Sequence, residues 1–130
     1  MESKTTAEQS IEAADRLFKA IERGDVAAIR EIYAPGAKIW HNNDGATQTV
    51  DENLAVLTWV VANVSEREYA EVRRQATPTG FVQQHVLRGR VKSTGKELHL
   101  PACMVCAVEH GRITRLDEYF DSAHLAAFTA

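Results

Sequence analysis

The sequence has little of what marks several classes of protein. It holds only two cysteines and three prolines, and no apolar run approaches the length of a membrane span. Basic residues do not outnumber acidic ones, and at a net charge of -3 no basic stripe is available to bind nucleic acid. The first residues, Met1 to Thr6, lack the apolar core of a secretory signal. We therefore expect a cytoplasmic protein with neither a membrane nor a nucleic-acid partner.

The cysteines and histidines do not predict a metal site. Cys103 and Cys106 match C-x-x-C, but the apolar run around them predicts a strand. Their odd separation puts the two sulfur atoms on opposite faces of that strand, where they can neither share a metal nor form a disulfide. The five histidines are not accompanied by a spaced carboxylate cluster. No metal is expected.

The remaining composition is that of one soluble domain, with 45% hydrophobic and 25% charged residues in a chain of 130. Apolar spacing and turn signals predict helices at 6–23, 26–33 and 49–64, strands at 38–41, 69–77, 81–91, 98–108 and 111–121, and a last segment, 123–130, that is a short helix or loose. The order α-α-β-α-β-β-β-β predicts an α+β fold with helices on one face of a sheet. If that sheet is strongly curved, it encloses an apolar pocket with the helices.

The last predicted strand carries a carboxylate in an unusual position. Alternation places Glu118 on the same face as Leu116 and Phe120. A buried carboxylate is costly unless it is paired or protonated, so the partner of Glu118 decides its role. On this strand alone, the simpler interpretation is a surface strand with Glu118 in water.

The whole pattern resembles the SnoaL-like branch of the NTF2-like superfamily, which has the cystatin-like fold. The resemblance rests on the order of elements and on Gly24-Asp25, Tyr33-Ala34-Pro35-Gly36-Ala37, Trp40-His41-Asn42 and the final strand from Gly111 to Asp121. It covers nearly the whole chain and implies a cone with helices on a strongly curved mixed or antiparallel sheet. Relatives include polyketide cyclases, ketosteroid isomerases and limonene epoxide hydrolases. Homodimerisation through the outer face of the sheet is also implied.

The second half of the chain is most similar to limonene epoxide hydrolases. In that family an Arg-x-Asp and an Asp on the last strand hold a water, and the corresponding residues here are His85, Leu87 and Glu118. The family's Tyr-x-Asn on the first strand corresponds to Trp40 and Asn42. Asn42 and a longer acid are thus retained, whereas the Arg and its partner Asp are not. This departure argues against epoxide hydrolysis.

Ketosteroid isomerases have an Asp base on the first strand, where His41 or Asn42 falls here. Their oxyanion-hole positions correspond to Leu17 and Met104, so those donors are missing. Since neighbouring residues of a strand face opposite ways, Trp40 and Asn42 cannot share the pocket with His41 unless the strand bulges. His41 is therefore either the base or a surface ring, and the surface position is favoured.

The resemblance directs a set of side chains into one cavity. The predicted catalytic residues are a His85–Glu118 pair across the cavity and Asn42 beside it. The predicted substrate-binding residues are Trp40, Leu87, Leu100, Ala102, Met104 and Phe120. A carboxylate fixes the tautomer of an imidazole and raises its basicity, so the pair could remove a proton next to a carbonyl or activate a water.

Two functions remain open on this basis. The first is an isomerase, cyclase or hydrolase that acts without a cofactor on a small hydrophobic molecule. The second is a non-catalytic binding or accessory protein with the same cavity, in which the histidine and the carboxylate satisfy each other.

Overall fold

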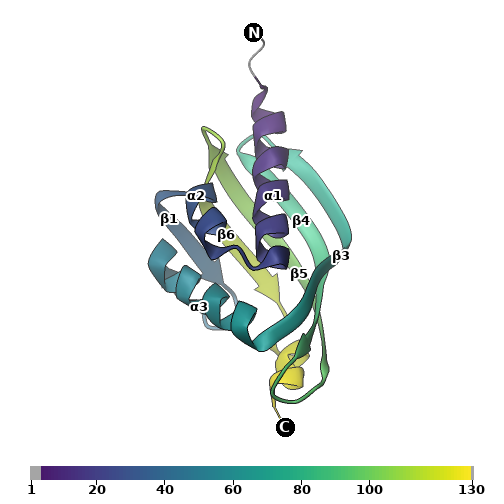
Figure 1. Ribbon diagram of the computed structural model, residues 1–130. Helices are drawn as coiled ribbons and strands as arrows, with labels where there is room; N and C mark the ends of the chain where they lie inside the picture. The colour runs from purple at the N-terminus through teal and green to yellow at the C-terminus, as the bar shows by residue number, and fades with distance from the viewer. Residues whose placement is uncertain (1–3, 130) are drawn as a thin grey trace.

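The computed structural model of the protein describes residues 4–129, so Met1 to Ser3 and Ala130 lie outside the described residues. Ala130 is the last residue of the predicted segment 123–130. Three helices lie on one face of a six-stranded sheet (Figure 1). The elements are α1 (Thr6–Arg23), α2 (Val26–Ile32), β1 (Tyr33–His41), β2 (Thr47–Gln48), α3 (Val50–Asn63), β3 (Val64–Thr77), β4 (Gly80–Val91), β5 (Glu97–Glu109), β6 (Arg112–Phe120) and a 3-10 helix η1 (Ser122–Phe128).

The ends of the helices follow from their capping residues. The Thr5 hydroxyl accepts a hydrogen bond from the backbone N–H of Glu8 at the start of α1, and Gly24 ends that helix with a left-handed backbone. At the start of α3, Thr49 and Glu52 form both hydrogen bonds of a capping box. These predicted ends of α1 and α3 are confirmed to within one residue.

The sheet is open and mixed, with strand order β2-β1-β6-β5-β4-β3. Only β1 and β6 pair in parallel, and the other neighbours are antiparallel. The predicted α+β class and the position of the helices on one face of the sheet are confirmed. The sequence missed the early start of β1, because Ala34-Pro35-Gly36 is typical of a turn, and the strand β2, because two residues show no period. It missed the early start of β3, because Ser65 to Glu68 mixes charged and polar side chains without a clear period.

Two bulges interrupt β3. Glu66 and Glu71 have φ values of 55° and 53°, and the pairing with β4 changes register at both places. A bulge bends its strand and increases the local twist. The bend at Glu66 lets the preceding helix α3 run directly into β3, so that the strand curves around the helical layer (Figure 1).

The bulge at Glu66 also turns Arg67 toward the helices. The guanidinium of Arg67 donates hydrogen bonds to the carbonyls of Ile21 and Glu22 at the end of α1, and to those of Val61 and Val64 at the end of α3. The last carbonyls of a helix have no partner within the helix and carry partial negative charge. One side chain therefore caps two helices.

The buried side chains form two clusters on the helical face of the sheet. The larger one joins α1, α2 and the start of α3 to β1, β5 and β6, and includes Leu17, Phe18, Ile39 and Met104. The smaller one surrounds Leu100 near the β4–β5 hairpin and η1. A cavity separates the two clusters.

Candidate functional site

The cavity has a volume of about 450 Å³ and is mostly apolar. Side chains from α1, α3, η1 and all six strands line it. The apolar and aromatic members are Leu17, Ile21, Tyr33, Ile39, Val56, Leu57, Trp59, Val60, Tyr69, Leu87, Leu98, Leu100, Met104, Leu116, Phe120, Leu125 and Phe128, and the polar members are His41, Asn43, Asp44, Gln48, Asn53, Arg67 and Glu118. This size and composition suit a small ligand with one polar group.

The register of the sheet places two ionisable side chains together on the cavity wall. Gln83, Met104, Glu118 and His41 are successive partners across β4, β5, β6 and β1. Facing side chains of paired strands lie close together, so the last two of this row meet.

His41 and Glu118 form an ion pair. The distance from His41 Nε2 to Glu118 Oε1 is 3.2 Å, and the side chains are only 18% and 14% exposed. The hydrogen bond that His41 donates to Glu118 raises the pKa of His41, against the opposing effect of burial, and the charges of Glu118 and Asp44 also raise it. His41 is therefore a stronger base than a free imidazole.

A second set of polar side chains lies at the same end of the cavity. The Tyr33 hydroxyl donates to Asn53 Oδ1 at 3.1 Å, and Asn53 Nδ2 donates to Gln48 Oε1 at 3.2 Å. Burial and the negative charge of Glu118 raise the pKa of Tyr33, so its hydroxyl stays protonated. The single hydroxyl proton of Tyr33 is used in the hydrogen bond to Asn53, which leaves the hydroxyl oxygen as an acceptor.

Tyr69, on β3, is another side chain of the cavity wall. Burial is the main cause that raises the pKa of its hydroxyl, and the charge of Glu118 adds to it. Tyr69 therefore stays a neutral phenol that can donate a proton in a hydrogen bond. Its ring is fixed by edge contacts with Phe18 and His85, with ring centres 4.8 and 4.7 Å apart.

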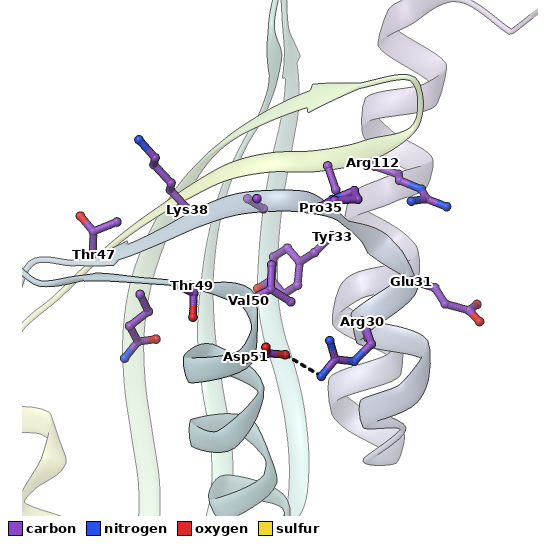
Figure 2. A pocket seen from close by; sticks show the side chains of 14 residues that line it. Arg30, Glu31, Tyr33, Pro35, Lys38, Thr47, Thr49, Val50, Asp51 and Arg112 are labelled. Atoms are coloured by element: carbon purple, nitrogen blue, oxygen red, sulfur yellow. Dashed lines mark ion pairs between the residues drawn. The ribbon is translucent and has the colours of Figure 1, made fainter.

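Tyr33 and Gln48 also separate the cavity from a hollow on the outside of the protein. Figure 2 shows this hollow between the end of α2, the strand β1 and the start of α3. Arg30 and Asp51 pair with each other across it at 2.8 Å. Unlike the inner cavity, this hollow lies on the surface and is also lined by the charged residues Glu31, Lys38 and Arg112.

His85 is buried next to the cavity but is not part of its lining. Its ring is 3% exposed, Nδ1 lies 2.9 Å from Gln83 Nε2, and Arg74 Nε donates to Gln83 Oε1 at 2.7 Å. Burial and the nearby Arg74 lower the pKa of His85 to about 4, although Glu118 acts the other way. The amide of Gln83 makes Nδ1 the acceptor, so Nε2 carries the proton, and that buried atom has no partner. The partner of Glu118 in the structure is His41 and not His85.

The predicted first-strand residues lie outside the cavity. The side-chain oxygen of Asn42 accepts from the backbone N–H of Phe120 at 2.9 Å and so joins the ends of β1 and β6. Trp40 lies on the outer face of the sheet, where its ring contacts Tyr119 with centres 5.2 Å apart. The alternation of a strand explains both positions, because His41 between them faces inward.

The predicted substrate-binding residues divide in a similar way. The structure brings Leu87, Leu100, Met104 and Phe120 into the cavity wall. Ala102 is buried on the same face of β5 as Met104 but does not reach the cavity, because its side chain is short. Whether any of these residues contacts a substrate stays a prediction.

Asn53, Tyr69 and Asp44 are among the members of the site that were not singled out from the sequence. Asn53 lies three and four residues from Val50 and Leu57 on the inward stripe of α3, and a polar residue in such a stripe is a signal for a buried hydrogen bond. Tyr69 lies in a strand whose charged neighbours hide its inward position. Asp44 belongs to a turn, and the sequence offers no signal for its place at the rim.

The described part of the chain holds neither a ready group of metal ligands nor a helix that could span a membrane. Within residues 4–129, no group of three or more His, Cys, Asp or Glu side chains is arranged to hold a metal ion. In the same part of the chain, none of the helices combines the length and the apolar content that a membrane crossing requires.

Comparisons with solved structures show the same fold in proteins of low identity. A proposed polyketide cyclase from Xanthomonas campestris pv. campestris matches with a TM-score of 0.84 and 18% identity, over 97% of this chain and 100% of the other. A hypothetical protein of ketosteroid isomerase-like fold from Catenulispora acidiphila, solved in complex with trimethylamine, matches with a TM-score of 0.79 and 14% identity, over 91% and 92%. An LEH-like epoxide hydrolase of M. tuberculosis matches with a TM-score of 0.77 and 16% identity, over 92% and 88%.

A comparison with curated proteins gives no match. The family model of the SnoaL-like domain matches residues 14–116, which span the elements from α1 to the middle of β6. The order of elements, the mixed sheet and the enclosed cavity agree with this match. The chain therefore belongs to the SnoaL-like domain family, within the NTF2-like fold.

Proposed function

We propose that this protein is an enzyme that moves a proton on a small, mostly apolar molecule, as an isomerase, cyclase or hydrolase without a cofactor. One observation carries the proposal. The His41–Glu118 ion pair lies on the wall of a 450 Å³ apolar cavity, with both side chains largely withdrawn from water. Perturbed ionisable pairs in clefts are typical of acid–base sites.

In this proposal His41 accepts the proton and Glu118 strengthens it as a base. Nε2 of a neutral His41 donates to the carboxylate, so Nδ1 carries the lone pair. The imidazolium formed after proton transfer is stabilised by the adjacent negative charge. General base catalysis of this kind typically contributes about 10²- to 10⁴-fold.

The Tyr69 hydroxyl is our candidate for the group that stabilises negative charge developing on the substrate. It faces the same cavity as Glu118 and keeps its proton, because burial raises its pKa. A hydrogen-bond donor aimed at a developing oxyanion contributes about 10²- to 10³-fold in known enzymes. Tyr69 would replace the oxyanion-hole donors of ketosteroid isomerases, whose positions are occupied here by the apolar residues Leu17 and Met104.

The roles predicted for His85 and Asn42 remain proposals of lower rank. The Nε2–H of His85 has no partner, and His85 could act on a ligand if the Tyr69 ring moved away from it. Asn42 could act by holding the ends of β1 and β6, and with them His41 and Glu118, in register. Asn42 would thus position other groups, whereas His85 would contact the ligand itself.

Hydrogen exchange on a model substrate tests the proposal. We would incubate the protein with a small β,γ-unsaturated cyclic ketone in D₂O and follow deuterium uptake and double-bond migration by NMR. His41→Gln should reduce the rate roughly hundredfold. Glu118→Gln should move the rise of the rate with pH to lower pH, because it lowers the pKa of His41.

Glu109→Gln is the matched control, since Glu109 is an exposed carboxylate at the far end of β5. It should leave the exchange rate unchanged. A panel of such ketones that binds without exchange would instead favour the non-catalytic binding protein. Equal rates in the native protein and in His41→Gln would rule out the proposed base.

We also propose a homodimer formed through the outer face of the sheet. Val72, Val105 and Tyr119 are exposed on that side. Size-exclusion chromatography with light scattering measures the assembly, and Tyr119→Glu should shift it toward the monomer. A monomer at all protein concentrations would contradict this assembly.

A further inference from the structure

We infer that the cavity selects against anions and that its natural substrate is a small apolar amine, whose ammonium group is held at Glu118. The inference rests on the proposed small-molecule function of the same cavity and names its substrate class. It comes from the charges that face the cavity and from the aromatic rings around them.

The two carboxylates of the cavity, Glu118 and Asp44, are not balanced by a free Lys or Arg side chain of the described lining. Glu118 lies on the wall and Asp44 at the rim. Among the described residues of the lining, Arg67 is the one Lys or Arg side chain. Four of its five N–H donors are directed to the backbone carbonyls at the ends of α1 and α3, where helix dipoles offset its charge.

A carboxylate or phosphate ligand is disfavoured by this arrangement. It would lie next to Glu118 with no basic group to bind it, apart from His41, which Glu118 already engages. Like charges a few ångströms apart in a partly buried site repel strongly enough to weaken binding about tenfold or more.

A protonated amine is favoured by the same arrangement. Its N–H groups can donate to Glu118, which presents acceptor oxygens only. The rings of Trp59, Tyr69 and Phe120 line the cavity, and the faces of aromatic rings attract cations. The apolar wall formed by the leucines of β4 and β5 would receive the rest of the molecule.

The geometry also assigns a consequence for His41. An ammonium at Glu118 competes with His41 for the carboxylate and so lowers the pKa of His41 toward that of a free imidazole. Binding of the amine therefore favours the neutral imidazole, the form that accepts a proton, while reducing the help that Glu118 gives to its basicity. The other ionisable groups at this end are Asp44 beside His41, and Tyr33 and Tyr69, which stay neutral phenols.

Three probes that share one rigid apolar body test the inference. They are 1-adamantylamine, 1-adamantanol and 1-adamantanecarboxylate, and their Kd values would be measured by isothermal titration calorimetry near neutral pH. We expect the amine to bind about tenfold or more tightly than the alcohol, and the carboxylate to bind most weakly. A carboxylate that binds as tightly as the amine would overturn the inference.

Glu118→Gln is the decisive variant. It should remove the preference, so that the amine and the alcohol bind alike, while the control Glu109→Gln keeps the preference. Thermal unfolding of each variant checks that it is folded. If Glu118→Gln folds and still prefers the amine, the carboxylate is not the amine site and the inference fails. NMR titration of His41 should show a lower pKa in the amine complex than in the alcohol complex.

The outcomes separate this inference from the proposed function. If the amine and the alcohol bind equally, and Leu100→Trp blocks both by filling the cavity, the small-molecule function stands and the amine preference is wrong. If none of the three probes binds to the folded protein, both proposals fail.

Discussion

The buried His85 makes a quantitative prediction about stability and pH. Its pKa is about 4 in the folded protein, against an ordinary value of 6.5. The unfolded chain therefore binds a proton at a higher pH than the folded protein does. Its contribution to the free energy of unfolding is complete above pH 6.5 and is lost as the pH falls toward 4.

The size of this effect follows from the two pKa values. Each pH unit between them is worth about 1.4 kcal/mol, so the full loss is about 3 kcal/mol. The ring is almost completely buried, so solvent screening reduces this figure little. A loss of this size is a large share of the stability of a domain of this length.

Urea unfolding from about pH 8 to about pH 4.5 measures the effect, with His85→Gln as the comparison. Carboxylates and His41 titrate in both proteins, so the difference between the two curves isolates His85. Losing the hydrogen bond to Gln83 should make the variant less stable by a constant amount of about 1–3 kcal/mol. The native protein should lose more stability than the variant as the pH falls. A difference that stays constant over the whole range would refute the reasoning.

Three further predictions concern single contacts. Glu118→Gln should lower the pKa of His41 in an NMR titration and destabilise the protein most at low pH. The raised pKa of His41 stabilises the folded state below pH 6.5, and this contribution is lost as the pH rises through the raised value. Equal destabilisation at low and high pH would contradict the pairing of His41 with Glu118. Arg67→Met should lower the free energy of unfolding by about 3 kcal/mol or more, because carbonyls at two helix ends lose a charged donor, and Arg67→Lys should restore part of it. Thr49→Ala should cost about 1 kcal/mol through loss of the α3 cap, with the exposed Thr47→Ala as a control near zero.

The fold was predictable because its signals are local. Capping residues such as Thr49, the left-handed Gly24 and the turn at His110 and Gly111 fix where elements begin and end. The parallel contact between β1 and β6 depends on two segments more than seventy residues apart, so local signals do not predict it. The bulges of β3 had no signal, since Glu66 and Glu71 are ordinary residues in a charged stretch.

The site was predictable only in part, for a physical reason. Alternation correctly places Glu118, Met104 and Phe120 on one face, because the period of a strand is a property of the backbone. The partner of Glu118 depends on which strand lies beside β6 and in which register, and a shift of one residue exchanges His41 for Trp40 or Asn42. Neither the neighbouring strand nor its register can be read from the strand itself. The resemblance therefore points to His85 instead of His41 as the partner of Glu118.

The shared cap at Arg67 has a consequence for how a ligand reaches the cavity. The ends of α1 and α3 bind to one guanidinium, so neither helix end can fray without releasing the same side chain. These two helices should therefore open together and rarely, with similarly slow amide hydrogen exchange. The short helix η1, whose Leu125 and Phe128 line the cavity, lies outside this coupling and should exchange much faster. Entry to the cavity would then pass by the C-terminal end of the chain, while the helical wall stays closed.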